Sequence, residues 1–198
     1  DSDACHARYE FGPVYTEGRG VTSIAFPDNI KGINKAGIHF IKNGIWYRVL
    51  NNNDVCVAFS PSYTGDLIIP STVSAGNTFT VKSIAQYAFA SCSGVSSITI
   101  PESVTSIGDD AFWGCSNLSS ATFGNVDVSR SGLTFTKNNI TYQVLSNSEV
   151  AVSGAESTIT DVSIPNTLTA GNIFAVKSIY KNAFANCKNI ESVTIPDN

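Results

Sequence analysis

The sequence has no methionine, only two histidines and few charged side chains, and each shortage narrows the choice of function. Lysine, arginine, aspartate and glutamate make up 14% of the 198 residues, against ~25% in an average protein, and the formal net charge is -4. Lysine and arginine do not cluster anywhere, which excludes binding along a nucleic-acid backbone. The sequence also lacks a run of about 18 apolar residues, so we predict no membrane span in this segment.

The absence of methionine, together with Asp1 as the first residue, indicates a processed or excised piece of a larger precursor. Small neutral polar side chains take the place of the charged ones, which is common among secreted proteins. Hydrophobic residues make up 42% of the chain, enough to bury a core. We therefore expect a folded protein that is secreted or displayed on the cell surface.

The two histidines give little basis for catalysis. A hydrolase triad needs a histidine, and the candidates are His6 and His39, of which His39 is expected at a strand edge. The adjacent carboxylates Asp109 and Asp110 precede Ala111, a position that favours capping of a helical turn over calcium binding or catalysis. We predict that the chain is not an enzyme and that it has no catalytic residues, metal site or cofactor.

Internal repeats dominate the rest of the sequence. A 23-residue unit with the pattern V-x-S-I-x-x-x-A-F-x-x-C occurs at residues 81–103, 104–126 and 176–198, and a partial copy lies at 21–33. No unit of this length can bury its own apolar edge. Neighbouring units are therefore expected to stack in register and form one continuous core, as in a solenoid.

Spacing within one unit predicts its local structure. In residues 95–101, VSSITIP, inward and outward side chains alternate, which predicts a strand that Pro101 ends. In residues 111–115, AFWGC, the spacing of Ala, Phe and Cys suits one helical turn. Stacking of neighbouring units then places Phe89 beside Phe112.

A longer period is superimposed on the short one. Residues 38–101 align with residues 133–196 without a gap, and 31 of the 64 positions are identical. Each long unit begins with an insert, near 38–80 and near 133–175, in which two alternating runs flank an Asn-rich or Ser-rich turn. This pattern predicts β-hairpins.

Three of the five cysteines follow the repeat. Cys92, Cys115 and Cys187 occupy the same position in three units, which predicts a structural column of buried thiols, with zinc binding as the disfavoured alternative. Cys5 and Cys56 lie outside this column. Two alternatives stay open for them, a disulfide if the chain is exported, or two separate thiols.

Two sets of residues are candidates for contact with a partner. Aromatic residues that other copies lack at the same position indicate exposure, and tryptophan and tyrosine are common binding anchors. The alternative is that each packs on its neighbours. These aromatics are Trp46, Tyr63, Tyr87, Trp113 and Tyr180. Outward threonines form the second set, either as good strand formers or as a weak contact face. They are Thr99, Thr122 and Thr194.

The repeats resemble those of the BspA-like leucine-rich-repeat proteins, a surface family of Bacteroidetes, treponemes and some mucosal protists. The segments SIAQYAFASC (83–92), SIGDDAFWGC (106–115) and SIYKNAFANC (178–187) carry the resemblance, together with ITIP (98–101) and VTIP (193–196). The resemblance implies a curved solenoid, export to the cell surface, and adhesion to host matrix proteins or other bacteria. It carries no catalytic residues.

We therefore expect a strand-rich leucine-rich-repeat solenoid with short helical turns, formally of the α/β class, interrupted by β-hairpin inserts. Residues 1–20 are expected to form an N-terminal cap or leader, and residues 21–198 a single solenoid. The leading functional hypothesis is a non-enzymatic binding or adhesion module for a host or bacterial surface protein. A self-assembling unit that joins through uncapped repeat ends and a glycan-binding accessory protein are the alternatives.

Overall fold

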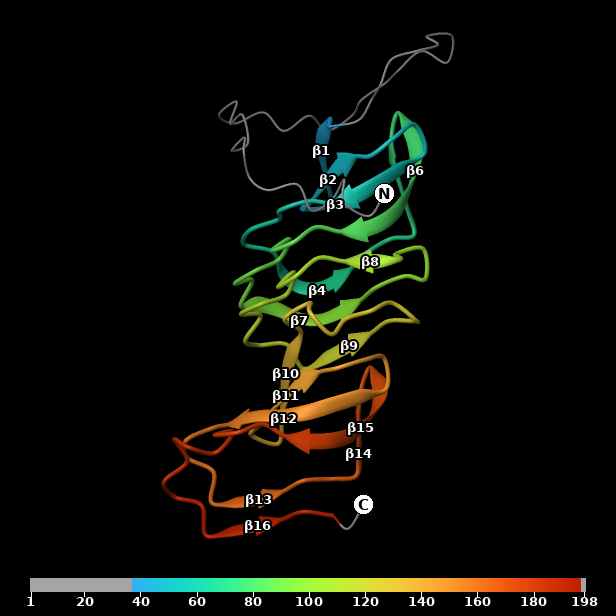
Figure 1. Cartoon of the computed structure of the whole chain (residues 1–198). Coiled ribbons are helices and arrows are strands. Elements are labelled where there is room, and N and C mark those ends of the chain that lie inside the picture. Colours follow the sequence, from blue (N-terminus) through green and yellow to red (C-terminus); the bar gives the residue numbers. More distant parts are fainter. Residues whose placement is uncertain (1–36, 197–198) are drawn as a thin grey trace.

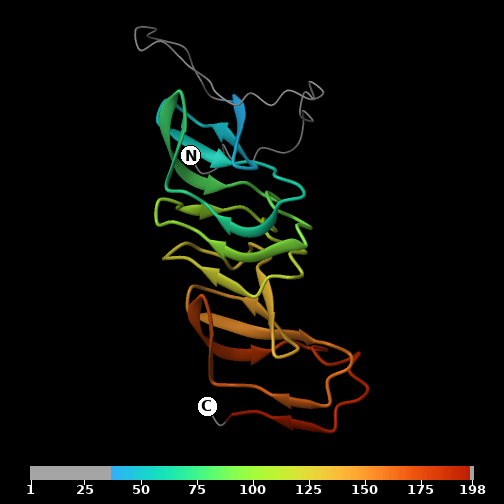
Figure 2. The same cartoon turned by 180° about the vertical axis from the view of Figure 1, so that it is seen from behind.

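The protein is a single-file stack of β-rungs, each rung being one circuit of the chain around a common core (Figure 1). The computed structural model describes residues 37–196, and within this range the predicted solenoid is confirmed. Figure 2 shows the same order of rungs from behind, from β1 at one end to β16 at the other. Cys5, His6, the segment 1–20 and the partial repeat 21–33 lie outside the described residues.

Strands and turns account for the regular structure of residues 37–196. In chain order the strands are β1 (His39–Lys42), β2 (Ile45–Val49), β3 (Asp54–Val57), β4 (Thr64–Ile68), β5 (Thr72–Ala75), β6 (Asn77–Ile84), β7 (Gly94–Thr99), β8 (Ser106–Ile107), β9 (Ser120–Thr122), β10 (Thr134–Lys137), β11 (Ile140–Val144), β12 (Glu149–Ala155), β13 (Asp161–Ser163), β14 (Thr167–Ala170), β15 (Asn172–Ile179) and β16 (Ser192–Thr194).

The two long units fold in the same way, which confirms the hairpin inserts. The first forms the sheet β1-β2-β3-β6-β5, to which β8 adds through β6, and the second forms the sheet β10-β11-β12-β15-β14. In both sheets the first three strands are antiparallel, and the third strand then pairs in parallel with a strand that enters the solenoid. His39 lies in β1 at the edge of the first sheet, as expected.

Alternating side chains fix the face that each hairpin buries. In β2, Ile45, Tyr47 and Val49 are buried, whereas the residues between them are only half-buried. The following turn is held by Asn51, whose Oδ1 accepts the backbone N–H groups of Asn53 and Asp54 at 2.8 and 2.9 Å. A side chain that binds its own turn explains why the Asn-rich segment joins two strands.

Parallel strands β4, β7 and β9 stack as the predicted solenoid face. Val95 and Ile98 are buried and Thr99 is exposed, so the strand in residues 95–101 has the expected inward and outward sides. On the outer side the carboxylate of Asp66 accepts the hydroxyls of Ser96 and Ser97, and these bonds lower the pKa of Asp66.

The segment from Gly108 to Cys115 is not the predicted helical turn. Its backbone makes separate i to i+3 turn bonds, such as Trp113 N–H to the carbonyl of Asp110 at 3.1 Å, and Asp110 has a left-handed φ of 53°. A left-handed residue stops helical progression. Within residues 37–196 the structure contains no helix, so the helix-capping role predicted for Asp109 and Asp110 is wrong.

Stacking of these turns builds the core. The rings of Phe89 and Phe112 are buried and parallel, with centroids 5.7 Å apart and an interplanar angle of 2°, which confirms the predicted pair. Backbone bonds join the same turns, including Phe89 N–H to the carbonyl of Ala111 at 2.8 Å. Each rung therefore buries the apolar edge of the next rung.

A tight turn joins the second long unit to the rung before it. Gly171 has a φ of +82° and forms an isolated parallel bridge with Ala121. Asn172 bonds both backbone groups of Phe123, accepting its N–H at 3.3 Å and donating to its carbonyl at 2.9 Å, and it also donates to the carbonyl of Asn147 at 3.0 Å. This unit junction fixes the position of the β10–β15 sheet on the solenoid.

Candidate ligand-binding groove

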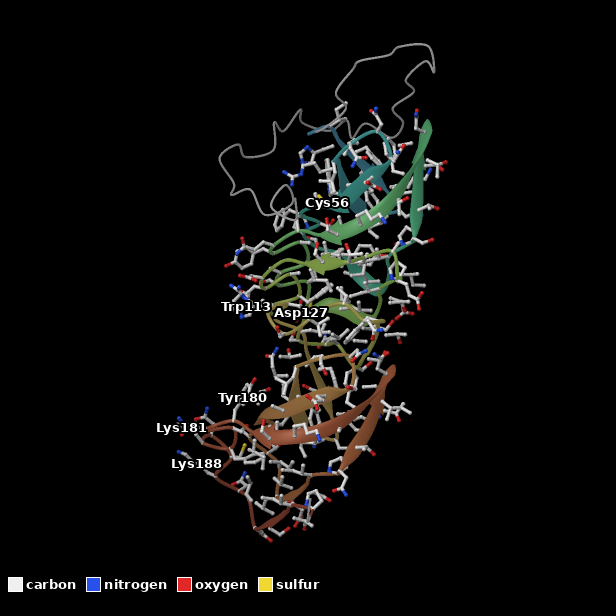
Figure 3. The ribbon with its side chains drawn as sticks, turned by 45° about the vertical axis from the view of Figure 1, so that its right-hand side comes forward. Cys56, Trp113, Asp127, Tyr180, Lys181 and Lys188 are labelled. Carbon is white, nitrogen blue, oxygen red and sulfur yellow. The ribbon has the colours of Figure 1, made fainter. Side chains whose placement is uncertain are left out.

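Three exposed aromatic side chains project from the same edge of the solenoid. This edge, here called the turn edge, consists of the equivalent turns at residues 85–92, 108–115 and 180–187. Tyr87 is 38% exposed, Trp113 is 58% exposed and Tyr180 is 44% exposed. Figure 3 shows Trp113 and Tyr180 on the same side of the molecule, one above the other.

The turn geometry explains why Trp113 points outward. Its neighbours in the sequence, Phe112 and Cys115, are buried and fill the core. Left-handed residues on either side, Asp110 at φ 53° and Gly114 at φ 75°, reverse the chain sharply and leave position 113 on the outside. The equivalent positions carry alanine in the other two units, so the protrusion of an indole is specific to this turn.

Trp113 and Tyr180 both line a groove of about 690 Å³. The connector at residues 129–132 forms part of its wall, and the outer face of β10, β11 and β12 forms its floor. The floor side chains are half-buried and neutral. They are Thr134, Thr136, Thr141, Gln143 and Ser153.

The groove exists because the stack of turns is interrupted. The connector covers the second turn as a short rung of its own, with the N–H of Asp110 donating to the carbonyl of Arg130 at 2.8 Å. A Cβ on Gly132 would lie 3.1 Å from Trp113, so the two segments are in close contact. The chain then turns away into β10, and the turn edge resumes only at Tyr180.

The same interruption makes room for the ring of Tyr180. The equivalent positions in the two stacked units are Ala85 and Gly108. A Cβ on Gly108 would lie 2.3 Å from the backbone nitrogen of Gln86, so directly stacked turns tolerate only a very small residue there. At Tyr180 the neighbouring wall is the β10–β12 sheet rather than another turn, and a large ring fits.

The groove wall contains few charged side chains. Arg130 and Asp110 both line it, and the guanidinium of Arg130 donates to the carboxylate of the adjacent Asp109. Asp127 lines a smaller hollow of about 240 Å³ together with Asp109 and Arg130, and its pKa is lowered by the backbone N–H and the side chain of Ser129. The groove lining therefore has one side chain of each sign, Arg130 and Asp110, and the arginine is already engaged by Asp109.

The floor groups are partly used by internal hydrogen bonds. Gln143 Nε2 donates to the carbonyls of Leu133 and Val144 at 3.2 and 3.5 Å. Ser153 Oγ donates to the carbonyl of Thr141 at 3.3 Å, and the hydroxyls of Thr136 and Thr141 lie 3.1 Å apart. Because these bonds consume donors, the floor offers mostly acceptor atoms to a ligand.

The other candidate contact residues lie away from the groove. Trp46 is half-buried in β2, opposite Ile41. Tyr63 is half-buried and packs edge-on against Phe89 with centroids 6.1 Å apart. Trp46 and Tyr63 are thus partly covered by neighbouring residues, whereas Tyr87, Trp113 and Tyr180 are exposed to solvent.

The three threonines are exposed but do not form one ladder. Thr99 and Thr122 are neighbours in the register of β7 and β9. Thr194 pairs instead with Ser163 of β13, because the second hairpin unit separates the two stretches of solenoid face. The threonine face is therefore divided into two short segments.

The repeated cysteines are buried at their equivalent positions. Cys92 Sγ and Cys115 Sγ each donate to a carbonyl of the preceding rung, that of Ser60 and that of Phe89, at 3.4 Å. Burial, followed by the nearby Cys92 thiol, raises the pKa of Cys115 to about 12. Cys187 lies in the other stretch of solenoid and bonds the carbonyls of Ala155 and Glu156 at 3.6 Å.

Within residues 37–196, no group of three or more histidine, cysteine, aspartate or glutamate side chains converges to hold a metal ion. Cys56 is buried in β3, and Cys5, with which it could form a disulfide in one of the two alternatives, lies outside the described range. Among the described residues, no helix has the length and hydrophobicity needed to cross a membrane.

The polar part of the groove was not found by sequence reasoning. Its floor residues differ from those of the first long unit, where Trp46 and Arg48 stand in place of Thr141 and Gln143. This difference between equivalent positions of the two long units could have pointed to the floor residues. Arg130 and the other connector residues belong to no repeat, and nothing in the sequence placed them beside Trp113.

Comparison with known proteins agrees with the repeat pattern. The model of the BspA type leucine rich repeat region matches six copies, over residues 71–173 and 155–198. No curated protein matches the chain. Solved structures similar to the chain include a leucine-rich repeat protein from Bacteroides ovatus, with 24% identity and a TM-score of 0.44. The aligned region covers 79% of this chain and 41% of that protein.

Two further similar structures come from Bacteroides capillosus and Treponema pallidum, both leucine-rich repeat proteins. The first is 17% identical, with a TM-score of 0.41, and the aligned region covers 80% of this chain and 99% of that protein. The second is 20% identical, with a TM-score of 0.37, and the aligned region covers 80% of this chain and 72% of that protein. On the strength of the repeat match, which spans residues 71–198, the chain belongs to the BspA type leucine-rich-repeat family.

Proposed function

We propose that the chain is a non-enzymatic recognition module, secreted or displayed at the cell surface, that binds a surface protein of a host or bacterial cell. The observation that carries this proposal is the exposure of Tyr87, Trp113 and Tyr180, three rings that belong to equivalent turns of the turn edge. Membership of the BspA type family supports it, since this repeat fold provides an extended surface for protein contacts.

The three rings are suited to act as binding anchors. Large aromatic side chains lose little conformational entropy on binding, and they dominate the residues whose truncation costs about 2 kcal/mol or more. Here they are held by tight turns with left-handed backbone at Tyr87 and Asp110, so their positions are set before a partner arrives. Preorganisation of this kind reduces the cost of binding.

The proposal is tested with purified components. Immobilised host matrix proteins and bacterial surface proteins are probed with the wild-type chain and with the triple variant Y87A/W113A/Y180A. We expect at least one partner to bind, and its affinity for the triple variant to fall about 100-fold. The matched control is I68A/I173A, which removes two exposed apolar side chains from strands β4 and β15.

The outcomes separate cleanly. An equal loss in the triple variant and in the control would contradict a role for the turn edge. Failure of every protein in the panel to bind the wild-type chain would contradict the proposed function itself.

A further inference from the structure

We propose that the groove between Trp113 and Tyr180 binds a neutral oligosaccharide. This inference rests on the proposed function, because the oligosaccharide is taken to be part of the surface partner. Three properties of the groove support this ligand class: its rims are aromatic, its charged side chains disfavour an anion, and its floor offers hydrogen-bond acceptors.

The aromatic rims suit the apolar faces of sugar rings. Trp113 and Tyr180 line the same groove and expose 58% and 44% of their surface. A pyranose ring presents a flat patch of C–H groups that packs on an aromatic face, while its hydroxyls point sideways. Two such rims along a groove of about 690 Å³ leave room for several sugar units, within the usual size of ligand sites.

The charged side chains of the wall argue against an anionic ligand. Arg130 is already paired with Asp109, so its guanidinium is engaged, and Asp110 would repel an acidic ligand. A neutral ligand avoids this repulsion.

The floor distinguishes a sugar from a proline-rich peptide, the other ligand that docks in aromatic-lined grooves. Because Gln143 Nε2 donates to two backbone carbonyls, its Oε1 is the atom left for a ligand, and no described residue donates to it. Ser153 Oγ likewise donates inward and can only accept from the groove. Each proline of such a peptide lacks a backbone N–H donor, whereas every sugar hydroxyl can donate its O–H to these oxygens.

The first long unit provides an internal comparison. Where the groove floor has Thr141 and Gln143, the first unit has Trp46 and Arg48, and where it has Thr136 the first unit has Ile41. The same hairpin face is thus neutral and hydroxyl-rich only where it lies beside Trp113. The inference applies to the second unit alone.

Binding is measured through the fluorescence of Trp113. The chain has two tryptophans, so W46F leaves Trp113 as the single reporter at the groove. This variant is titrated with four neutral tetrasaccharides, built from α-linked glucose, β-linked glucose, mannose and galactose. We expect at least one to change the emission in a saturable way, with tetragalacturonate binding at least tenfold more weakly because Asp110 lines the site.

Variants then locate the site by calorimetry on the wild-type background. W113A and Y180A should each weaken binding of the active tetrasaccharide at least tenfold, and Q143L should weaken it by a similar factor. Alanine already stands at the equivalents of Trp113 and Tyr180, Ala90 and Ala85, so the repeat accepts both changes. I68A, which removes an exposed side chain of β4 outside the groove lining, is the control and should change the affinity less than twofold.

Two results would overturn the inference: unchanged Trp113 emission with all four sugars up to about 10 mM, or sugar binding that survives W113A and Y180A. The protein panel described above, repeated after enzymatic removal of glycans, separates this inference from the proposed function. Retained protein binding without sugar binding contradicts only the oligosaccharide. Sugar binding without any protein partner contradicts only the protein-recognition function.

Discussion

Replacing Gly171 by alanine should weaken the junction between the two long units more than backbone strain alone predicts. Gly171 has a φ of +82°, where a residue with a Cβ pays about 1–2 kcal/mol. An added Cβ would also lie 2.4 Å from the carbonyl oxygen of Ala121 and 2.6 Å from the hydroxyl of Thr122. The nearer of these atoms is backbone and cannot move away cheaply, so overpacking adds about 1–3 kcal/mol.

Gly65 is the matched control for this substitution. It has nearly the same φ, +83°, but an added Cβ meets nothing within 4 Å. G65A should therefore cost only the strain, about 1–2 kcal/mol, while G171A should cost about 2–5 kcal/mol. The difference between the two variants isolates the contact at the unit junction.

The assay is urea unfolding followed by far-UV circular dichroism, with the free energy of unfolding extrapolated to water for each variant. Because the junction fixes the β10–β12 sheet against the solenoid, G171A should also displace the groove floor from Trp113. Equal losses of stability in G65A and G171A would refute the reasoning, since they would show that the close approach to Ala121 does not constrain the fold.

Three further predictions follow from the core, the thiols and the outer face. F112A should lose about 3–5 kcal/mol of unfolding free energy in urea melts, because it removes a fully buried ring stacked on Phe89, and a loss below 1 kcal/mol would contradict the stacked core. Since burial raises the pKa of Cys115 from 9.0 to about 12, the unfolded chain releases this proton first as pH rises, so stability should be full below pH 9 and decline between pH 9 and 12. In urea melts at each pH, C115A should reduce this loss of stability, and an unchanged loss would contradict the role of the Cys115 thiol. Hydroxyl bonds from Ser97 and Ser96 lower the pKa of Asp66, so S97A should raise this pKa toward its ordinary value in NMR titrations, and an unmoved pKa would show that the Ser97 bond is unimportant.

The sequence predicted the stacked fold well because its signals are periodic. Each rung repeats the same inward residues, so Phe89 and Phe112 had to meet once the units were stacked in register. The offset between residues 38–101 and 133–196 likewise predicted two hairpin sheets of the same topology. These features depend on spacing alone, which a single sequence contains.

Helical turns were predicted wrongly because spacing does not report backbone handedness. Ala111, Phe112 and Cys115 have helical spacing, but Asp110 takes a left-handed conformation and the turn closes with i to i+3 bonds instead. Aspartate and asparagine tolerate this conformation better than most residues, so Asp110 and Asn182 at equivalent positions were a weak sign of it.

The groove could be predicted only in part. Trp113 and Tyr180 were singled out because other copies lack an aromatic residue at the same position, which correctly indicated exposure. That they share one groove depends on the path of the connector and on the tilt of the second sheet, set by Arg130, Gly132 and the junction at Gly171. Contacts of this kind occur once in the chain and follow no period.

Hydroxyl-radical footprinting of the chain, alone and bound to a surface partner from the protein panel, tests the turn edge as the recognition surface most directly. The account predicts strong protection of Trp113 and Tyr180 on binding, with Trp46 and Tyr63 unchanged. Protection confined to other strands, with Trp113 and Tyr180 as reactive in the complex as in the free chain, would contradict it.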